Sequence, residues 1–378
     1  MTHLEELTAI SRYYGANPAY VIAGGGNTSY KDASTLYIKG SGISLAESSP
    51  ASFVQMDRGM LQKIWTKTYP AEPAEREKAV LSDLMAARRA GEEQKRPSVE
   101  TLLHDILPFT WVIHTHPALV NGLTCSRQGE ARAKVLFPAE AIWIPTTNPG
   151  YILSQKVKQA MDAYCAEHHR APGLIFLQNH GVFVSADTIE GVHEGYRYIM
   201  EKLASNIQRS PDLSSGVSQW GVSAELGSAL TDLAGGGSMK AVFLRNHEIA
   251  KLVANRGAFA SVSSAFTPDH IVYAGSEPLF VETSSAIIGD IIADIRNIWK
   301  TFVDKTRRIP KIVAVQGIGV FGVGASEKAA ALGLELFTDT VKVAVYAESF
   351  GGYQFMPQDQ IDFINNWEVE RYRSQVIQ

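Results

Sequence analysis

The chain has 378 residues, of which 45% are apolar and 20% charged, and its formal net charge is −4. A chain of this length and composition can bury a sizeable core, and at roughly 100–200 residues per domain it favours two domains. The mild negative charge, without a Lys/Arg-rich run, argues against a nucleic-acid partner.

Two cysteines, Cys125 and Cys165, are too few for a disulfide framework and favour a reducing compartment. The first residues, MTHLEELTAISRYYG, lack the basic and apolar regions of a signal peptide. No run of about 18 uncharged apolar residues predicts a membrane span. We therefore expect a cytoplasmic protein that does not bind a membrane.

The first hundred residues alternate short apolar runs with glycine-rich turns. After an amphipathic helix, AYVIAGGGNTSYKD predicts a strand that enters a Gly-rich turn, and TLYIKGSG repeats this pattern. Helical spacing follows between residues 72 and 90. SVETLLHDIL predicts another helix, with Ser98 as its N-cap after Pro97.

The next hundred residues continue the alternation of strands and helices. FTWVIHTHP and AEAIWIPTT predict strands, SQKVKQAMDAYCAEHH a helix, GLIFLQNHGVFVSA a strand pair, and TIEGVHEGYRYIMEKLASNIQ a long helix. A Ser-rich stretch then interrupts the pattern before it restarts with AELGSALTDLA and KAVFLRN. We predict a first domain over 1–210, a linker over 211–218 and a second, smaller α/β domain over 219–378.

A short internal similarity links the two halves. LQNHGVFVSADT, from Leu177, aligns with VQGIGVFGVGAS, from Val315, and each segment precedes a long amphipathic helix. The match is short, so a degenerate copy of the first domain and a coincidence of strand–turn–helix chemistry both remain open. In either case His180 aligns with Ile318, so the second segment does not repeat this histidine.

Three histidines are candidate metal ligands. His114 and His116 end an apolar strand two positions apart, which places them on one face of that strand. His180, at the end of another strand, is the best third ligand for a site with an open position. An isolated His-x-His pair is more often a pair of surface residues, so the neighbouring motifs must decide.

A carboxylate and three polar turns accompany the histidines. Glu100, fourteen residues before His114, could act as a base beside a metal-polarised carbonyl, or only stabilise a helix start. The turns GGGNTS and KGSG and the position of Ser98 suit an anion, although each alone is more often an ordinary turn. Together they predict one phosphate pocket, whose candidate contacts are Asn27, Ser29, Ser41, Gly42 and Ser98.

The ordered set GGGNTS, KGSG, PSVE, HTHP and QNHG resembles the class II aldolase/adducin family over roughly the first 210 residues. TPDHIVY, VQGIGVFGVGAS and YAESFGGY resemble the middle region of bifunctional rhamnulose-1-phosphate aldolase/alcohol dehydrogenase proteins, here without the dehydrogenase domain. VQGIGVFGVGA lacks the spacing of a dinucleotide-binding loop. Val99 departs from family members that carry two serines before the glutamate.

The resemblance implies a fold, a site and an activity. The fold would be an α/β/α sandwich around a mainly antiparallel sheet, in a homo-oligomer that is commonly a tetramer. His114, His116 and His180 would bind Zn²⁺ or another divalent transition metal, Glu100 would be the acid/base, and Asn27, Ser41, Gly42 and Ser98 would contact the phosphate.

The expected reaction is reversible cleavage of a ketose 1-phosphate, a small-molecule sugar phosphate, to dihydroxyacetone phosphate and an aldehyde. A sugar-phosphate 4-epimerase and a non-catalytic, adducin-like binding protein remain alternatives. Retention of three histidines and Glu100 favours an enzyme.

Overall fold

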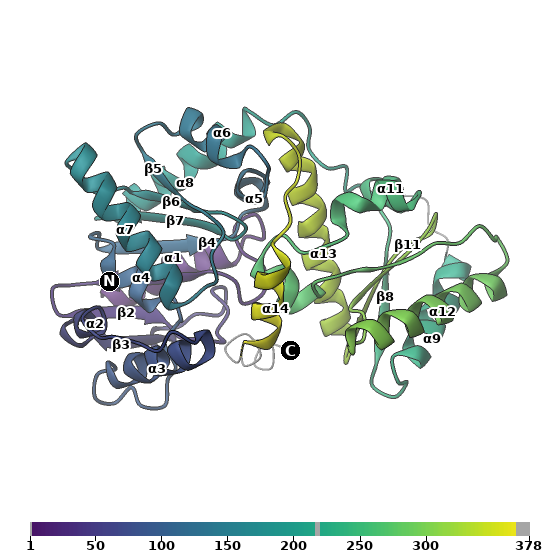
Figure 1. The fold of residues 1–378 in the computed structure, drawn as a ribbon, viewed down its shortest axis with the longest axis horizontal. Helices are drawn as coiled ribbons and strands as arrows, with labels where there is room; N and C mark the ends of the chain where they lie inside the picture. The colour runs from purple at the N-terminus through teal and green to yellow at the C-terminus, as the bar shows by residue number, and fades with distance from the viewer. Residues whose placement is uncertain (1, 216–219, 368–378) are drawn as a thin grey trace. The chain divides into compact units, whose positions relative to one another are not determined.

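The computed structural model describes residues 2–215 and 220–367 and divides them into two compact units (Figure 1). Unit 1 contains residues 2–124, 128–206 and 362–367. Unit 2 contains residues 125–127, 207–215 and 220–361. Among the described residues, no helix combines the length and apolar character that crossing a bilayer requires.

Unit 1 is built on a seven-stranded sheet in the order β3-β2-β1-β4-β7-β6-β5. All neighbouring strands are antiparallel except β5 and β6, so the predicted mainly antiparallel sheet is confirmed. The strands are β1 (Asn27–Lys31), β2 (Thr35–Lys39), β3 (Phe53–Asp57), β4 (Trp111–Thr115), β5 (Ala141–Ile144), β6 (Leu174–Leu177) and β7 (Gly181–Ala186).

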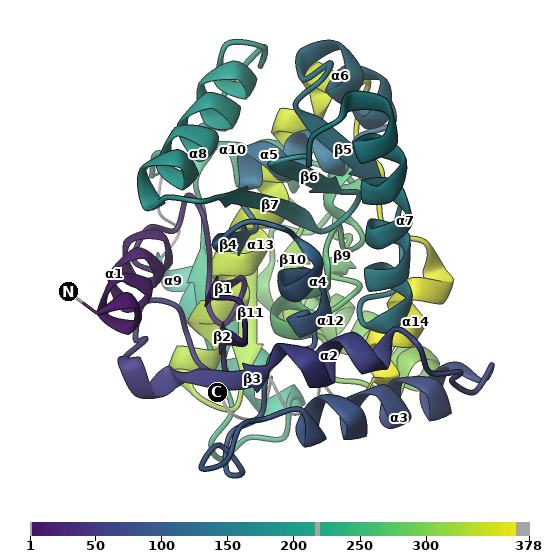
Figure 2. The same ribbon diagram turned by 90° about the vertical axis from the view of Figure 1, so that its left-hand side faces the viewer.

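Helices cover both faces of this sheet. Helices α1 (His3–Gly15) and α8 (Ile189–Ala204) lie on one side, and α4 (Thr101–Ile106) and α7 (Tyr151–His168) lie on the other (Figure 2). The strands therefore bury both faces, as in the predicted α/β/α sandwich. The remaining helices of this part are α2 (Arg58–Ile64), α3 (Pro73–Ala86), α5 (Ala118–Thr124), α6 (Gly129–Leu136) and the 3-10 turn η1 (Pro50–Ser52).

Two expectations for the first hundred residues are wrong. The predicted strand before GGGNTS is absent, because residues 19–26 form turns and β1 begins at Asn27. Ser98 does not cap α4, since the helix begins later and Glu100 holds the N-cap position. Instead, the Ser98 hydroxyl accepts a hydrogen bond from the Glu100 amide at 3.2 Å. The predicted linker, 211–218, falls partly outside the described residues.

Unit 2 contains a four-stranded sheet in the order β8-β11-β10-β9. Its strands are β8 (Lys240–Leu244), β9 (Leu279–Val281), β10 (Ile312–Val315) and β11 (Gly319–Gly324). Its helices are α9 (Trp220–Leu233), α10 (His247–Leu252), α11 (Arg256–Phe259), α12 (Ile288–Thr306) and α13 (Glu327–Ala347), with short turns η2 (Ala260–Val262), η3 (His270–Ala274) and η4 (Glu348–Phe350). The chain returns to unit 1 within α14 (Gln358–Asn366).

The sheet of unit 2 repeats part of the sheet of unit 1. The strands β4, β5, β6 and β7 have the spatial order β4-β7-β6-β5, which is the order in which β8 to β11 are arranged. The last two strands in each order are parallel and the others antiparallel. In both units a long helix precedes the hairpin and another follows it. This topology favours a duplicated domain over a coincidental motif.

The hairpin turns agree in their backbone hydrogen bonds as well. The second turn residue is left-handed in both, Asn179 with φ 58° and Gly317 with φ 70°. The shared bonds are Gln178 N to Ile144 O and Asn179 N to Thr124 O in unit 1, and Gln316 N to Val281 O and Gly317 N to Val253 O in unit 2. Because VQGIGVFGVGA forms this antiparallel hairpin, it does not form the strand-to-helix turn of a dinucleotide site.

The packing of β11 against α13 predicts a sharp difference between two glycines of unit 2. A methyl group at Gly322 would overlap the carbonyl oxygen of Ala330 and lie 2.8 Å from Leu334 Cγ. At Gly289 it would meet nothing within 4 Å. We expect Gly322→Ala to lower the free energy of unfolding by about 2 kcal/mol in urea denaturation. Gly289→Ala, the control, should be neutral or stabilising; equal effects would contradict the packing.

Candidate active site

Three histidine side chains converge at one end of the central strands of unit 1. The Nε2 atom of His114 lies 2.9 Å from that of His116 and 3.4 Å from that of His180. One ligand atom from each residue lies within 4.8 Å of the other two. Among the described residues, this is the one group of His, Cys, Asp or Glu side chains with such spacing. The structure thus brings the three predicted ligands together.

Strand pairing produces this convergence. His114 lies opposite Phe183 in the β4–β7 ladder, and His180 occupies the turn that connects β6 to β7. His116 follows β4 directly, two residues after His114. Gly181 lies against the end of β4, since a methyl group at this position would lie 2.5 Å from the Thr115 carbonyl oxygen and 2.7 Å from the His116 ring. A glycine after His180 therefore permits the close approach of turn and strand.

The orientation of His114 is fixed from two sides. Its ring is fully buried and stacks on Phe183, with 4.1 Å between ring centroids and an interplanar angle of 15°. Its Nδ1 lies 3.0 Å from the Val182 carbonyl oxygen, which can only accept a hydrogen bond. The proton therefore sits on Nδ1, and the Nε2 lone pair faces the other two histidines, as in metal-binding imidazoles.

Glu100 completes the cluster. Its Oε2 lies 3.6 Å from His114 Nε2, and its Oε1 lies 3.8 Å from His180 Nε2. The residue is 5% exposed, and among the described residues Oε1 has no hydrogen-bond partner. A buried carboxylate oxygen without a donor, facing a set of imidazole nitrogens, fits a divalent cation. The residues present therefore suit the metal that the resemblance implied.

Two of the predicted phosphate contacts adjoin Glu100. The Asn27 amide nitrogen donates to Glu100 Oε2 at 2.5 Å and to Ser98 Oγ at 3.4 Å. Asn27 lies opposite His114 in the β1–β4 ladder, so sheet register places it here.

The other glycine turn contacts the segment that leads to Ser98. Gly40 pairs with Pro97, and the Ser41 amide donates to the Arg96 carbonyl oxygen at 2.8 Å. Gly42 follows with φ 81°, a conformation that suits glycine. The predicted residues Ser41, Gly42 and Ser98 therefore belong to adjoining segments of unit 1.

Ser29 lies differently from the prediction. Its side chain is fully buried, and its hydroxyl lies 2.7 Å from His104 Nδ1. It is therefore unavailable for direct contact with a substrate phosphate, and we reassign it to the support of its neighbours. Ser29 shares the Asn27 face of β1, but it lies two positions further along the strand, where its hydroxyl meets His104 of α4.

His104 is the residue of this region that sequence reasoning missed. It is fully buried, and burial lowers the pKa of its imidazole well below the usual value. Its Nε2 also forms a hydrogen bond with the Asn27 side-chain oxygen. The available signal was the spacing of Glu100 and His104, which puts both on one face of a helix.

Unit 2 holds different residues at the positions equivalent to the three histidines. Matching the β4–β7 and β8–β11 registers places Phe243 at the position of His114 and Arg245 at that of His116. Ile318 occupies the turn position of His180. Arg245 donates hydrogen bonds to the carbonyl oxygens of Gly317 and Ile318. The equivalent turn in unit 2 therefore lacks imidazole ligands and is held by a guanidinium group.

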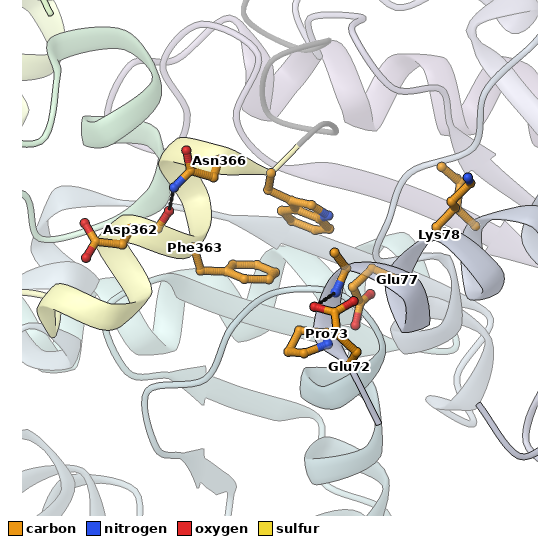
Figure 3. Close-up of a pocket in the computed structure, with 10 residues that line it drawn as sticks. Glu72, Pro73, Glu77, Lys78, Asp362, Phe363 and Asn366 are labelled. Atoms are coloured by element: carbon orange, nitrogen blue, oxygen red, sulfur yellow. Dashed lines mark hydrogen bonds between the residues drawn. The ribbon is translucent and has the colours of Figure 1, made fainter. Parts of the chain in front are cut away.

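A separate pocket of about 740 Å³ lies between α3 and the end of α14, where Phe363 points toward Pro73 and Glu77 (Figure 3). The Glu77 carboxylate accepts hydrogen bonds from the Tyr151 amide and from Arg76. The pocket contains none of the predicted site residues. It therefore lends no group to the histidine cluster.

Comparison with known proteins identifies the family. Residues 5–204 match the family model of the class II aldolase and adducin N-terminal domain, and residues 221–373 match that of the second domain of class II aldolases. The chain belongs to the class II aldolase and adducin family.

Individual relatives are distant. An uncharacterized oxidoreductase of Bacillus subtilis (strain 168), YuxG, is 21% identical over 412 residues, which cover 98% of this chain and 58% of the relative. The N-terminal class II aldolase domain of a conserved Thermoplasma acidophilum protein shares 23% identity with a TM-score of 0.46, covering 54% of this chain and 93% of that one. L-fuculose-1-phosphate aldolase of Thermus thermophilus shares 15% identity with a TM-score of 0.34, covering 54% of this chain and 91% of that one.

The contrast between the units predicts the metal content. We expect the purified protein, loaded with Zn²⁺ and desalted, to retain one metal ion per chain by elemental analysis. His180→Ala should abolish this retention without loss of the thermal unfolding transition, because it removes one of three ligands. His193→Ala, in helix α8, is the matched control and should retain the ion. Two ions per chain, or unchanged metal in His180→Ala, would contradict the assignment.

Proposed function

We propose that the chain catalyses metal-dependent, reversible aldol cleavage of a ketose 1-phosphate to dihydroxyacetone phosphate and an aldehyde. The observation that supports this most directly is Glu100. A buried carboxylate, with one oxygen lacking a hydrogen-bond donor, lies next to two of the three converging imidazoles and accepts a hydrogen bond from Asn27. A proton-transfer group beside a Lewis-acid site is what enolisation next to a carbonyl requires.

His114, His116 and His180 would hold the metal, which we propose to be Zn²⁺; another divalent transition metal would suit the same nitrogen set. When bound, such an ion stabilises the negative charge that develops on a carbonyl oxygen. The imidazoles themselves are neutral ligands, and the Val182 carbonyl fixes which nitrogen of His114 faces the site.

Glu100 would move the proton at carbon. In the direction of synthesis its carboxylate removes a proton from the hydroxymethyl carbon next to the carbonyl of dihydroxyacetone phosphate. That carbon then attacks the aldehyde carbon, and the alkoxide oxygen that forms takes up one proton, which balances the proton removed. In the direction of cleavage the carboxylic acid returns the proton to the same carbon.

Asn27, Ser41, Gly42 and Ser98 would bind the phosphate. Ser41 and Ser98 supply hydroxyl donors, and Gly42 supplies a backbone turn with φ 81° that lets an anion approach. The Asn27 amide nitrogen donates to Glu100 and, at 3.4 Å, to Ser98, and its contact with the phosphate would replace the longer of these bonds. Asn27 and Ser98 adjoin Glu100, and the turn with Ser41 and Gly42 contacts the segment that leads to Ser98, which supports one pocket for phosphate and reacting carbon.

The name of the longer Bacillus relative refers to an oxidoreductase. The chain spans 58% of that relative, and the one glycine-rich segment that resembles a nucleotide loop forms a hairpin here. We therefore carry no redox activity over to this chain. We propose a cytoplasmic homo-oligomer, a tetramer by the resemblance; light scattering after gel filtration would test the oligomeric state.

Glu100→Gln tests the chemistry. The variant should retain the metal but lower turnover at least about 10²-fold, because an amide cannot accept the proton. The measurement is release of dihydroxyacetone phosphate from a panel of ketose 1-phosphates, with product analysis to separate cleavage from epimerisation at carbon 4. Near-native turnover in Glu100→Gln would assign the base elsewhere. Metal binding without turnover of any substrate would support the adducin-like alternative.

A further inference from the structure

A stripe of polar side chains on β1 faces one side of helix α4. Asn27, Ser29 and Lys31 alternate along the strand and therefore share a face. Glu100 and His104, four residues apart, share a face of the helical segment opposite. Asn27 bonds to both Glu100 and His104, Ser29 bonds to His104, and Lys31 Nζ donates to the His104 carbonyl oxygen at 2.7 Å.

The hydrogen bonds of His104 have one consistent direction. A buried neutral imidazole carries one proton, so one ring nitrogen donates and the other accepts. If the Ser29 hydroxyl donates to Nδ1, Nε2 carries the proton and donates to the Asn27 side-chain oxygen. The Asn27 NH₂ group then faces Glu100 Oε2 and Ser98 Oγ, both of which can accept. The reverse amide orientation would place two oxygen lone pairs against each other at Glu100.

We propose that His104 is a positioning residue for the active site, which acts by fixing the amide of Asn27 and, through it, the carboxylate of Glu100. This inference rests on the proposed role of Glu100 as the proton-transfer group. The two ring nitrogens of His104 bond to Ser29 and Asn27, and the ring meets Phe183 edge-on, with 5.4 Å between centroids. Its effect on Glu100 therefore passes through Asn27.

If His104 only stabilised the fold, its substitution would have a different effect from that of a positioning residue. Loss of a buried group lowers stability regardless of what stands at residue 27. A positioning residue instead changes the reaction only while Asn27 is present, so that the two substitutions are non-additive. The two roles are therefore separable by a double-mutant cycle.

The experiment follows exchange of the carbon-bound proton of dihydroxyacetone phosphate in D₂O by NMR, catalysed by the Zn²⁺-loaded full chain. His104→Leu should lower the maximal exchange rate about 10-fold or more, the effect of losing a hydrogen bond that orients a charged group. His104→Gln, whose amide can still donate to Asn27, should retain a higher exchange rate than His104→Leu. In an Asn27→Ala background, His104→Leu should cause little further loss. His193→Leu, which removes the histidine that bonds to Tyr14, is the control and should be unchanged.

A second readout is independent of activity. A crystal structure of metal-free His104→Leu should show the Asn27 amide no longer bonded to Glu100; if that variant does not fold, His104→Gln and Ser29→Ala enter the same cycle. Additive losses in the cycle, or an unmoved Asn27 amide, would overturn the positioning role. Absence of exchange in the metal-loaded wild-type chain would instead overturn the proposed function, and the inference with it.

Discussion

The site of this protein depends on the register of strand β4 between its two neighbours. The β1–β4 ladder sets Asn27 opposite His114, and the β4–β7 ladder sets His114 opposite Phe183. A slip of one residue in either ladder would turn the imidazole to the other face of the sheet. Val112 and Ile113 are fully buried on opposite faces, so packing on both sides opposes such a slip. The ligand geometry is therefore a consequence of how the core packs.

Unit 2 shows that this sheet and its turn do not require a metal. The same strand order and the same turn hydrogen bonds occur with Phe243, Arg245 and Ile318 at the equivalent positions. There the guanidinium of Arg245 satisfies the turn carbonyl oxygens. A metal in unit 1 would thus serve chemistry more than folding, and a duplicated fold that keeps the architecture while losing the ligands is consistent with that division.

The sequence was sufficient for the parts of the fold that follow a simple periodicity. Apolar runs that end in histidines or glycines predicted β4, β6 and β7, and helical spacing predicted α3, α7 and α8. It was insufficient for β1, whose residues NTSYK show no apolar face. This strand is polar and buried because α1 and α4 supply partners, such as the Ser11 hydroxyl 2.7 Å from that of Thr28. Those partners are distant in sequence, and a propensity argument cannot anticipate them.

The candidate site likewise contains residues that the sequence predicts and residues that it does not. Histidines two positions apart on a strand have a local signature, and their convergence with His180 is found as predicted. His104 and Asn27 are 77 positions apart, and the sequence around either residue alone does not indicate that the two are hydrogen-bonded. Ser29 was assigned to the phosphate because only its neighbours in sequence were visible, whereas its partner lies on α4.

The cost of burying this polar network indicates what the network is for. An apolar strand in place of β1 would pack between two helices with no need for matched donors and acceptors. Instead Asn27, Ser29 and Lys31 each use a hydrogen bond to α4 or its N-cap residue, and the series ends at that residue, Glu100. At that end Oε1 is left without a donor among the described residues, a condition that costs about 1–3 kcal/mol when nothing compensates it. The atom left without a donor, Glu100 Oε1, lies 3.8 Å from His180 Nε2 at the edge of the histidine cluster, and a cation held by that cluster would supply the missing interaction.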